Sequence, residues 1–181
     1  MTHRLFVGIR PPPSIRDALI DLMDGVENAR WQDDDQLHLT LRYIGEVDAH
    51  LADELAERLG AVDQPAFDVM IEGTGFFERK GTAHTLWAGI APSPELAKLQ
   101  RRIERICVAA GLEPEHRKYY PHITLARLNQ SSGPIAPFCA RTAGLALGPW
   151  SVDSYILYES TLHREGSLYE PVVRYPLETR L

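Results

Sequence analysis

The pattern His-x-Thr-Leu occurs twice in this chain, at residues 38–41 and again at residues 122–125. Because the chain has only seven histidines, two copies are expected by chance in roughly one chain in a thousand of this composition. Each copy lies in a short stretch rich in apolar residues, which is typical of a β-strand. Side chains alternate along a strand, so His38 and Thr40 share one face while the neighbouring leucines occupy the other. The repeat therefore predicts two strands that each present a histidine and a threonine.

The second copy places His122 and Thr124 on one face of its strand in the same way. If the two polar faces meet across a groove, the site contains two imidazoles that titrate near neutral pH and two hydroxyls. Two histidines can divide one proton donation and one proton abstraction between them. Such a site suits an in-line displacement at phosphorus.

Length and composition predict one globular domain over residues 1–181, with 44% hydrophobic and 24% charged residues. The first apolar run, residues 5–9, is too short for a signal peptide or a membrane span. We therefore expect a cytoplasmic protein that does not bind membranes. A net charge of −6 argues against a protein that coats long nucleic acids, but leaves open a small anionic ligand in a local basic pocket. Cys107 and Cys139 are expected to be reduced thiols, and no zinc-binding Cys/His spacing occurs.

Hydrophobic periodicity and turn residues predict seven strands and three helices. The strands are expected at residues 4–10, 37–44, 67–77, 86–91, 122–128, 152–162 and 168–177, and the helices after a Ser14 cap, at 49–60 and at 94–110. Residues 129–133 read as a loop and residues 163–166 as a hairpin turn, while the acidic run 33–35 reads as a solvated turn. No glycine-rich phosphate loop follows any strand, and the order of elements predicts an α+β fold with mostly antiparallel sheets.

Several longer segments carry a specific resemblance to a known family. They are RLFVGIRPP (residues 4–12), WQDDDQLHLTLRYIGEV (31–47), LWAGI (86–90), YYPHITLARL (119–128) and LYESTL (157–162). The chain resembles the 2H phosphoesterases, named for two H-x-[T/S] motifs, and within them the RNA 2′,3′-cyclic phosphodiesterase branch, also called 2′-5′ RNA ligases. The resemblance implies a bilobal fold with two antiparallel-rich sheets around a central groove and helices outside. It also implies chemistry without a metal or cofactor, in which a 2′,3′-cyclic phosphate on RNA or a nucleotide is opened to a 2′-phosphomonoester, with minor reverse ligation of 2′-5′ linkages.

The same resemblance implies which histidine does which work. His38 is expected to donate a proton to the departing ribose 3′-oxygen, and His122 to accept a proton from the attacking water. The hydroxyls of Thr40 and Thr124 are expected to hold the non-bridging phosphate oxygens, on which negative charge builds. The alternative for both threonines is that they are simply good strand formers.

An arginine near the phosphate would help, since its planar fork matches phosphate geometry. The family places one two residues after the second motif, which is Arg127 in this chain. Simple alternation puts Arg127 on the face away from His122, so this role requires a bulge, a twist or the end of the strand. Arg42 lies on the face of His38 by alternation and is the second candidate.

Other interpretations remain open at this level. The chain could be a module that binds nucleotides or RNA ends without turnover, or a zinc hydrolase that uses both motif histidines and a third ligand, His84 or Asp35. The aromatic residues near the strands could stack on a base or fill the core; they are Phe6, Trp31, Trp87, Tyr119 and Tyr120. The five other histidines are expected at the surface or in structural hydrogen bonds; they are His3, His50, His84, His116 and His163.

Overall fold

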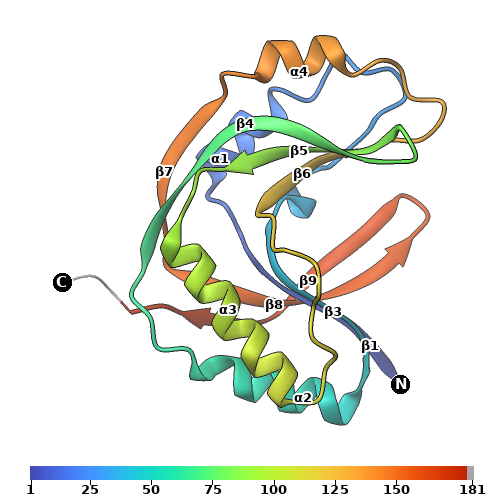
Figure 1. Cartoon of the computed structure of the whole chain (residues 1–181). Coiled ribbons are helices and arrows are strands. Elements are labelled where there is room, and N and C mark those ends of the chain that lie inside the picture. The colour runs from blue at the N-terminus through green and yellow to red at the C-terminus, as the bar shows by residue number, and fades with distance from the viewer. Residues whose placement is uncertain (179–181) are drawn as a thin grey trace.

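The computed structural model describes residues 1–178 and contains nine strands, four α-helices and two short 3₁₀ helices within them (Figure 1). The elements are β1 (Thr2–Ile9), α1 (Pro13–Ile20), β2 (Arg30–Trp31), η1 (Asp34–Gln36), β3 (Leu39–Asp48), α2 (Ala49–Arg58), η2 (Leu59–Ala61), β4 (Phe67–Arg79), β5 (Thr82–Ile90), α3 (Pro94–Ala109), β6 (His122–Arg127), α4 (Ala136–Thr142), β7 (Ala146–Val152), β8 (Ser154–His163) and β9 (Gly166–Pro176). The last three residues of the domain expected over 1–181 lie outside the described residues. The predicted α+β class is confirmed.

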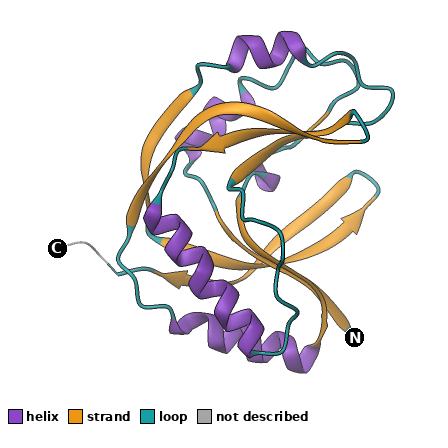
Figure 2. Ribbon diagram, viewed as in Figure 1, coloured by secondary structure: helices purple, strands orange, loops and turns teal. Residues whose placement is uncertain are grey.

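The strands form one sheet in the order β7-β4-β5-β6-β3-β1-β8-β9, with β2 paired to β6. The pairings between these strands are antiparallel. The sheet consists of two halves, which are joined between β3 and β6 by a single residue pair, Leu39 and Ile123, and which diverge from that junction (Figure 2). The two antiparallel-rich sheets expected around the groove are thus the two halves of one sheet, because the two motif strands are direct neighbours and their pairing makes the sheet continuous.

Helices cover the outside of both halves. α2 contacts β1 and β3, α3 contacts β3 and β4, α1 contacts β7, and α4 contacts β4 (Figure 1). α3 shows why these helices form: Ser93 caps it by accepting a hydrogen bond from the Leu96 amide, and Pro94 is its first residue. The buried side chains of α3 recur every three or four residues, at Leu96, Leu99, Ile103 and Cys107. Burial of its apolar stripe against the sheet is therefore the main source of the helix's stability.

Some elements differ from the sequence-based expectation. α1 begins at Pro13, with Pro12 rather than Ser14 as its cap, because the fixed φ of proline suits the first helical position. Neither α4 nor β7 is predicted by the sequence pattern, since α4 is seven residues long and β7 contains Gly148 and Pro149. Both cysteines are free, as expected. Among residues 1–178, no helix is long and apolar enough to cross a membrane.

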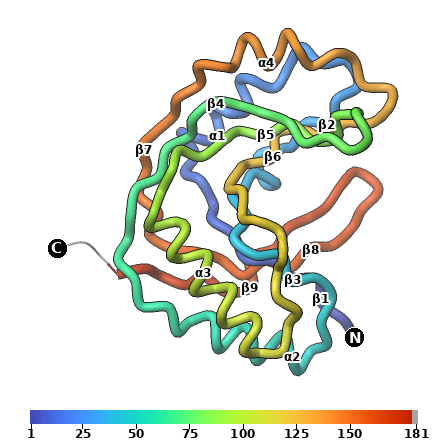
Figure 3. Tube along the Cα trace, viewed as in Figure 1, coloured from blue at the N-terminus to red at the C-terminus, as the bar shows by residue number. Residues whose placement is uncertain are grey.

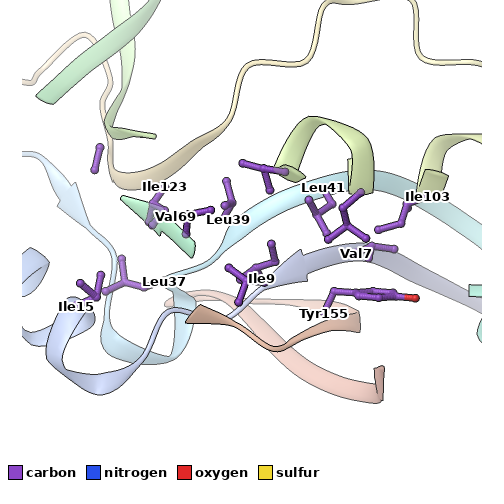
Figure 4. Packing of buried hydrophobic residues seen from close by; sticks show 14 of the residues in the cluster. Val7, Ile9, Ile15, Leu37, Leu39, Leu41, Val69, Ile103, Ile123 and Tyr155 are labelled. Carbon is purple, nitrogen blue, oxygen red and sulfur yellow. The ribbon is translucent and has the colours of Figure 1, made fainter. Parts of the chain in front are cut away.

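The apolar residues of the two motifs lie at the centre of the core. Leu39, Leu41, Ile123 and Leu125 are each at most 2% exposed. Figure 4 shows Leu41 packed together with Ile103 of α3. Full burial of one such side chain contributes about 1.5–3 kcal/mol. The two motifs are therefore anchored from behind by the most buried part of the protein.

Candidate active site

The register of the two motif strands brings their polar residues together. With Leu39 directly opposite Ile123 in an antiparallel pair, the four flanking polar side chains project from the other side of the sheet. In this register Thr40 is the cross-strand neighbour of His122, and Thr124 is the cross-strand neighbour of His38. The four residues are thus related by a pseudo-twofold axis through the Leu39–Ile123 pair, and we call their side of the sheet the histidine face.

A β-bulge in β6 places Arg127 on the histidine face. Successive residues of β5 pair with Thr124 and Ala126, so Leu125 is the extra residue. Leu125 and Ala126 are consequently both fully buried, and alternation resumes one residue later. Arg127 is exposed and projects from the side that carries His122. The bulge required for Arg127 to lie near His122 is therefore present.

The equivalent bulge in β3 has the opposite effect on Arg42. Leu41 is the extra residue of β3, and Arg42 turns toward the core, where it is 8% exposed. Its guanidinium donates to Glu104 Oε2 at 2.5 Å and to the carbonyl of Glu113 at 2.6 Å. Arg42 is therefore a buried structural residue and does not lie on the histidine face, because the bulge reverses the alternation that suggested it. Tyr43, which is 52% exposed, occupies the position equivalent to Arg127.

Both motif histidines have the same hydrogen-bonding arrangement. Nδ1 of His38 lies 2.8 Å from the carbonyl oxygen of Gln36, and Nδ1 of His122 lies 2.7 Å from that of Tyr120. A carbonyl oxygen only accepts, so each Nδ1 carries a proton and donates it. Each Nε2 is then free, as a proton acceptor when the ring is neutral and as a donor when it is charged.

An ion-pair cluster fixes the segment that leads to His38. Asp34 in η1 accepts hydrogen bonds from Arg16 at 2.9 Å and from Arg10 at 3.2 Å, and these two arginines hold the pKa of its carboxyl below the usual value. The expected solvated turn is therefore tied to β1 and α1 by Asp34. Because η1 ends at Gln36, the cluster also fixes the carbonyl that orients the His38 ring.

Aromatic side chains surround the ring of His38. The ring centroid of Phe6 lies 4.8 Å from that of His38, and those of Tyr169 and Tyr158 lie at 5.1 and 6.3 Å. Burial among these rings lowers the pKa of His38 to about 4, against the hydrogen bond to the Gln36 carbonyl, which raises it. His38 is therefore neutral at pH 7 in the ligand-free protein.

His122 has a similar aromatic environment. Phe77 packs edge-on against its ring with centroids 4.8 Å apart, and Trp87 lies at 6.2 Å. Burial is again the main cause of a lowered pKa, and the charge of Arg127 lowers it further. His122 and Arg127 also lower the pKa of His38 electrostatically. Both imidazoles and the charged Arg127 guanidinium therefore face the same space, where a bound anion would be favoured.

Sequence reasoning identified only part of these aromatic walls. Phe6 and Trp87 come from a second repeat, Leu-aromatic-x-Gly-Ile, at residues 5–9 and 86–90, and this repeat is the signal that could have paired them with the two histidines. Tyr158 and Tyr169 come from the β8–β9 hairpin, and only the segment LYESTL hinted at its role.

The remaining polar groups of the histidine face are available to a ligand. The hydroxyls of Thr40 and Thr124 have no hydrogen-bond partner among residues 1–178. Arg127 donates one hydrogen bond, from Nη1 to Thr85 Oγ1 at 3.2 Å, which leaves most of its fork free. In the described part of the chain, no three His, Cys, Asp or Glu side chains gather as a metal site requires. Two imidazoles, two hydroxyls and one guanidinium form a set that can hold a phosphate and move protons on both sides of it.

Comparison with known proteins agrees with this chemistry. Residues 11–164 match the 2′-5′ RNA ligase superfamily. The chain is 33% identical over 141 residues to the RNA 2′,3′-cyclic phosphodiesterase of Aeropyrum pernix, a match that covers 76% of this chain and 80% of that protein. It is 29% identical over 179 residues to the RNA 2′,3′-cyclic phosphodiesterase of Escherichia coli K12, with 97% of each covered. The crystal structure of E. coli LigT complexed with 3′-AMP superposes with a TM-score of 0.78 at 26% identity, over 98% of this chain and 99% of that one.

Proposed function

Because this chain belongs to the 2′-5′ RNA ligase superfamily, we propose that it is an RNA 2′,3′-cyclic phosphodiesterase. Its substrate is a 2′,3′-cyclic phosphate at an RNA end or on a nucleotide, and its product is the 2′-phosphomonoester. The observation that carries the proposal is the pseudo-twofold set of two histidines and two threonines, related through the Leu39–Ile123 pair. The bulge in β6 adds Arg127 to this set.

The reaction needs one base and one acid on opposite sides of the phosphorus. Neutral His122 takes a proton from water at Nε2, and the water oxygen forms a bond to phosphorus. The bond from phosphorus to the ribose 3′-oxygen breaks, and protonated His38 gives the proton on its Nε2 to that oxygen. The hydroxyls of Thr40 and Thr124 and the guanidinium of Arg127 hold the non-bridging oxygens.

The charge of the substrate explains how His38 becomes an acid. In the free protein the pKa of His38 is about 4, so the ring is neutral at pH 7 when the substrate first binds. A phosphate anion placed against the ring favours the imidazolium form and raises the pKa. The active protonation state is thus created by substrate binding, while His122, whose pKa is also lowered, is already neutral as a base must be.

An oligonucleotide that ends in a 2′,3′-cyclic phosphate tests the proposal in the presence of EDTA. The expected product is the 2′-phosphate, and His38→Asn and His122→Asn should each reduce turnover by about 10²–10⁴-fold. His50→Asn, on the exposed side of α2, is the matched control and should retain wild-type activity. A 3′-phosphate product, or full activity in either site variant, would contradict the assigned roles.

The same assay separates the two other functions. Tight binding of a 2′-phosphonucleotide without hydrolysis of any cyclic substrate would identify a binding module. Activity that EDTA removes and Zn²⁺ restores would identify a metal-dependent hydrolase.

A further inference from the structure

A second pair of positive groups lies next to the histidine face, where β2 pairs with β6. Arg30 is directly opposite Arg127 in this antiparallel pair, so the two side chains project from the same side of the sheet. Like charges in directly opposite positions destabilise a sheet. Within residues 1–178, the Arg30 side chain takes part in no ion pair or hydrogen bond. The fold thus places two arginines side by side with no carboxylate between them.

These arginines line a cavity of about 200 Å³ between β2, β6 and the β8–β9 hairpin. Gln32, His163 and Ser167 add groups that can donate hydrogen bonds, and no Asp or Glu lines the cavity. Such a composition stands out in a chain whose net charge is −6. The cavity is therefore suited to an anion.

The cavity adjoins the candidate catalytic groups. Tyr169 lines it and packs edge-on against the ring of His38, with centroids 5.1 Å apart. Gln36 also lines it, and the carbonyl of Gln36 orients His38. Arg127 forms part of its wall and also lies on the histidine face. A ligand that occupies both places therefore carries two negative groups a short distance apart.

The hairpin holds this cavity in shape. Figure 3 shows the β8–β9 hairpin projecting away from the rest of its half of the sheet. Gly166, at the hairpin turn, has φ of +126°, and a Cβ atom there would lie 3.1 Å from Arg30 Nη2 and 3.1 Å from Gln36 Nε2. Gln36 Nε2 in turn donates to the carbonyl of Ser167 at 3.0 Å. The absence of a side chain at Gly166 is thus what allows the turn to pack against the Arg30 guanidinium.

We propose that Arg30 and this cavity bind the second phosphate of the substrate, on the 5′ side of the nucleotide that bears the cyclic phosphate. The proposal rests on the proposed function and names its preferred substrate: a cyclic phosphate end that carries a further phosphate. Arg127 lies between the two phosphates and contacts either, because its fork presents five donors. The second phosphate is either an internucleotide diester or a 5′-terminal monoester, and both offer the same anionic oxygens to Arg30.

Three substrates test this proposal on the purified full-length protein. They are a nucleoside 2′,3′-cyclic phosphate with a 5′-hydroxyl, the same compound with a 5′-phosphate, and a dinucleotide that ends in a 2′,3′-cyclic phosphate. Arg30→Ala should raise KM for the two substrates with a second phosphate by about 10- to 100-fold, as expected for a lost charged hydrogen bond. It should leave kcat unchanged, and change the 5′-hydroxyl substrate less than twofold. Arg105→Ala, an exposed arginine on α3, is the charge-matched control and should behave as wild type.

Salt dependence provides a second readout. Because each phosphate contact contributes a slope of about −0.7 to the logarithm of affinity against the logarithm of salt for single strands, Arg30→Ala should reduce the slope for the dinucleotide by about that amount. The 5′-phosphate and dinucleotide arms also show whether the cavity prefers a monoester or a diester.

Two kinetic outcomes and one binding outcome would overturn the proposal. Equal losses on all three substrates would mean that Arg30 acts on the cyclic phosphate or on the fold, and no loss on any would mean that the cavity binds no phosphate. If the wild-type protein hydrolyses none of them, the proposed function fails, but the cavity can still be tested by calorimetry. A nucleoside 2′,5′-bisphosphate should then bind more tightly than the 2′-monophosphate, and Arg30→Ala should remove that difference; equal binding of the two ligands by the wild-type protein would refute the second-phosphate site.

Discussion

Arg42 and Arg127 each follow one of the two motifs, but we expect Arg42 to stabilise the fold and Arg127 to support turnover. Replacing each by methionine distinguishes these two roles. Arg42 is buried against Glu104, whose side chain is 21% exposed to solvent. Arg42→Met leaves that carboxylate partly buried without its partner, which costs about 3–5 kcal/mol in fully buried pairs. Because Glu104 retains some contact with water, we expect the lower end of this range, about 3 kcal/mol. The double variant Arg42→Met/Glu104→Met should recover most of this loss, since it removes both charges.

Arg127→Met should instead leave the fold nearly intact. Its guanidinium is exposed and donates one hydrogen bond, of 3.2 Å, to Thr85, so we expect a change of less than about 1 kcal/mol in unfolding free energy. Loss of a donor that stabilises charge in the transition state lowers kcat by about 10²–10³-fold. Arg42→Met is therefore expected to lose stability, and Arg127→Met is expected to lose turnover.

Urea unfolding and steady-state hydrolysis of a cyclic phosphate measure the two effects. A loss of 3 kcal/mol moves the urea midpoint by about 1 M or more, while kcat for the folded fraction of Arg42→Met should remain near that of the wild type. A stable Arg42→Met protein with a large loss of kcat, or a fully active Arg127→Met protein, would refute the assignment of the two side chains from the bulges.

Three further predictions concern the histidines and their support. The unfolding free energy should fall by about 2 kcal/mol between pH 7 and pH 5 on account of His38, because its folded pKa of about 4 lies below the unfolded value. The contribution of His38 to stability is complete above pH 6.5 and is lost as the pH falls toward 4. His38→Asn should flatten this pH dependence in urea unfolding, and an unchanged slope would contradict the low pKa. Inorganic phosphate should raise the pKa of His38 in an NMR titration, and an unaltered pKa at saturating phosphate would show that no anion binds beside the ring. Gly89→Ala should destabilise the protein by about 1–3 kcal/mol, because the new Cβ would lie 2.7 Å from the Glu72 carbonyl oxygen. The control Gly144→Ala meets nothing within 4 Å and should leave the melting temperature unchanged. Equal changes in melting temperature for the two variants would contradict the prediction.

The sequence was sufficient to predict the polar and apolar faces of both motifs. The two-residue period of a strand separates His38 and Thr40 from the leucines beside them, and the same period applies to His122 and Thr124. These residues stand before the bulges, so counting along the strand gives the correct face. The pairing of the two strands is a tertiary property, and the sequence suggested it only through the repetition of the motif.

Beyond the bulges, counting along the strand fails. One extra residue moves every later side chain to the other face, which is why simple alternation puts Arg42 on the histidine face and Arg127 away from it, although the resemblance already made Arg127 the first candidate. Nothing in the local sequence at Leu41 or Leu125 marks a bulge, because neither is a glycine. The walls of the site are equally hard to predict, since Tyr169 reaches His38 only through the path of the β8–β9 hairpin.

The single pair that joins the two halves of the sheet has a mechanical consequence. The other neighbouring strands along the order β7-β4-β5-β6-β3-β1-β8-β9 share four or more residue pairs each, but β3 and β6 share only Leu39 with Ile123. The angle between the halves is therefore set mainly by side-chain packing around these two residues, which are both fully buried. His38 and His122 flank this pivot on opposite halves. We therefore expect the spacing of the two candidate proton-transfer groups to depend on the volume of the few apolar side chains packed at this junction.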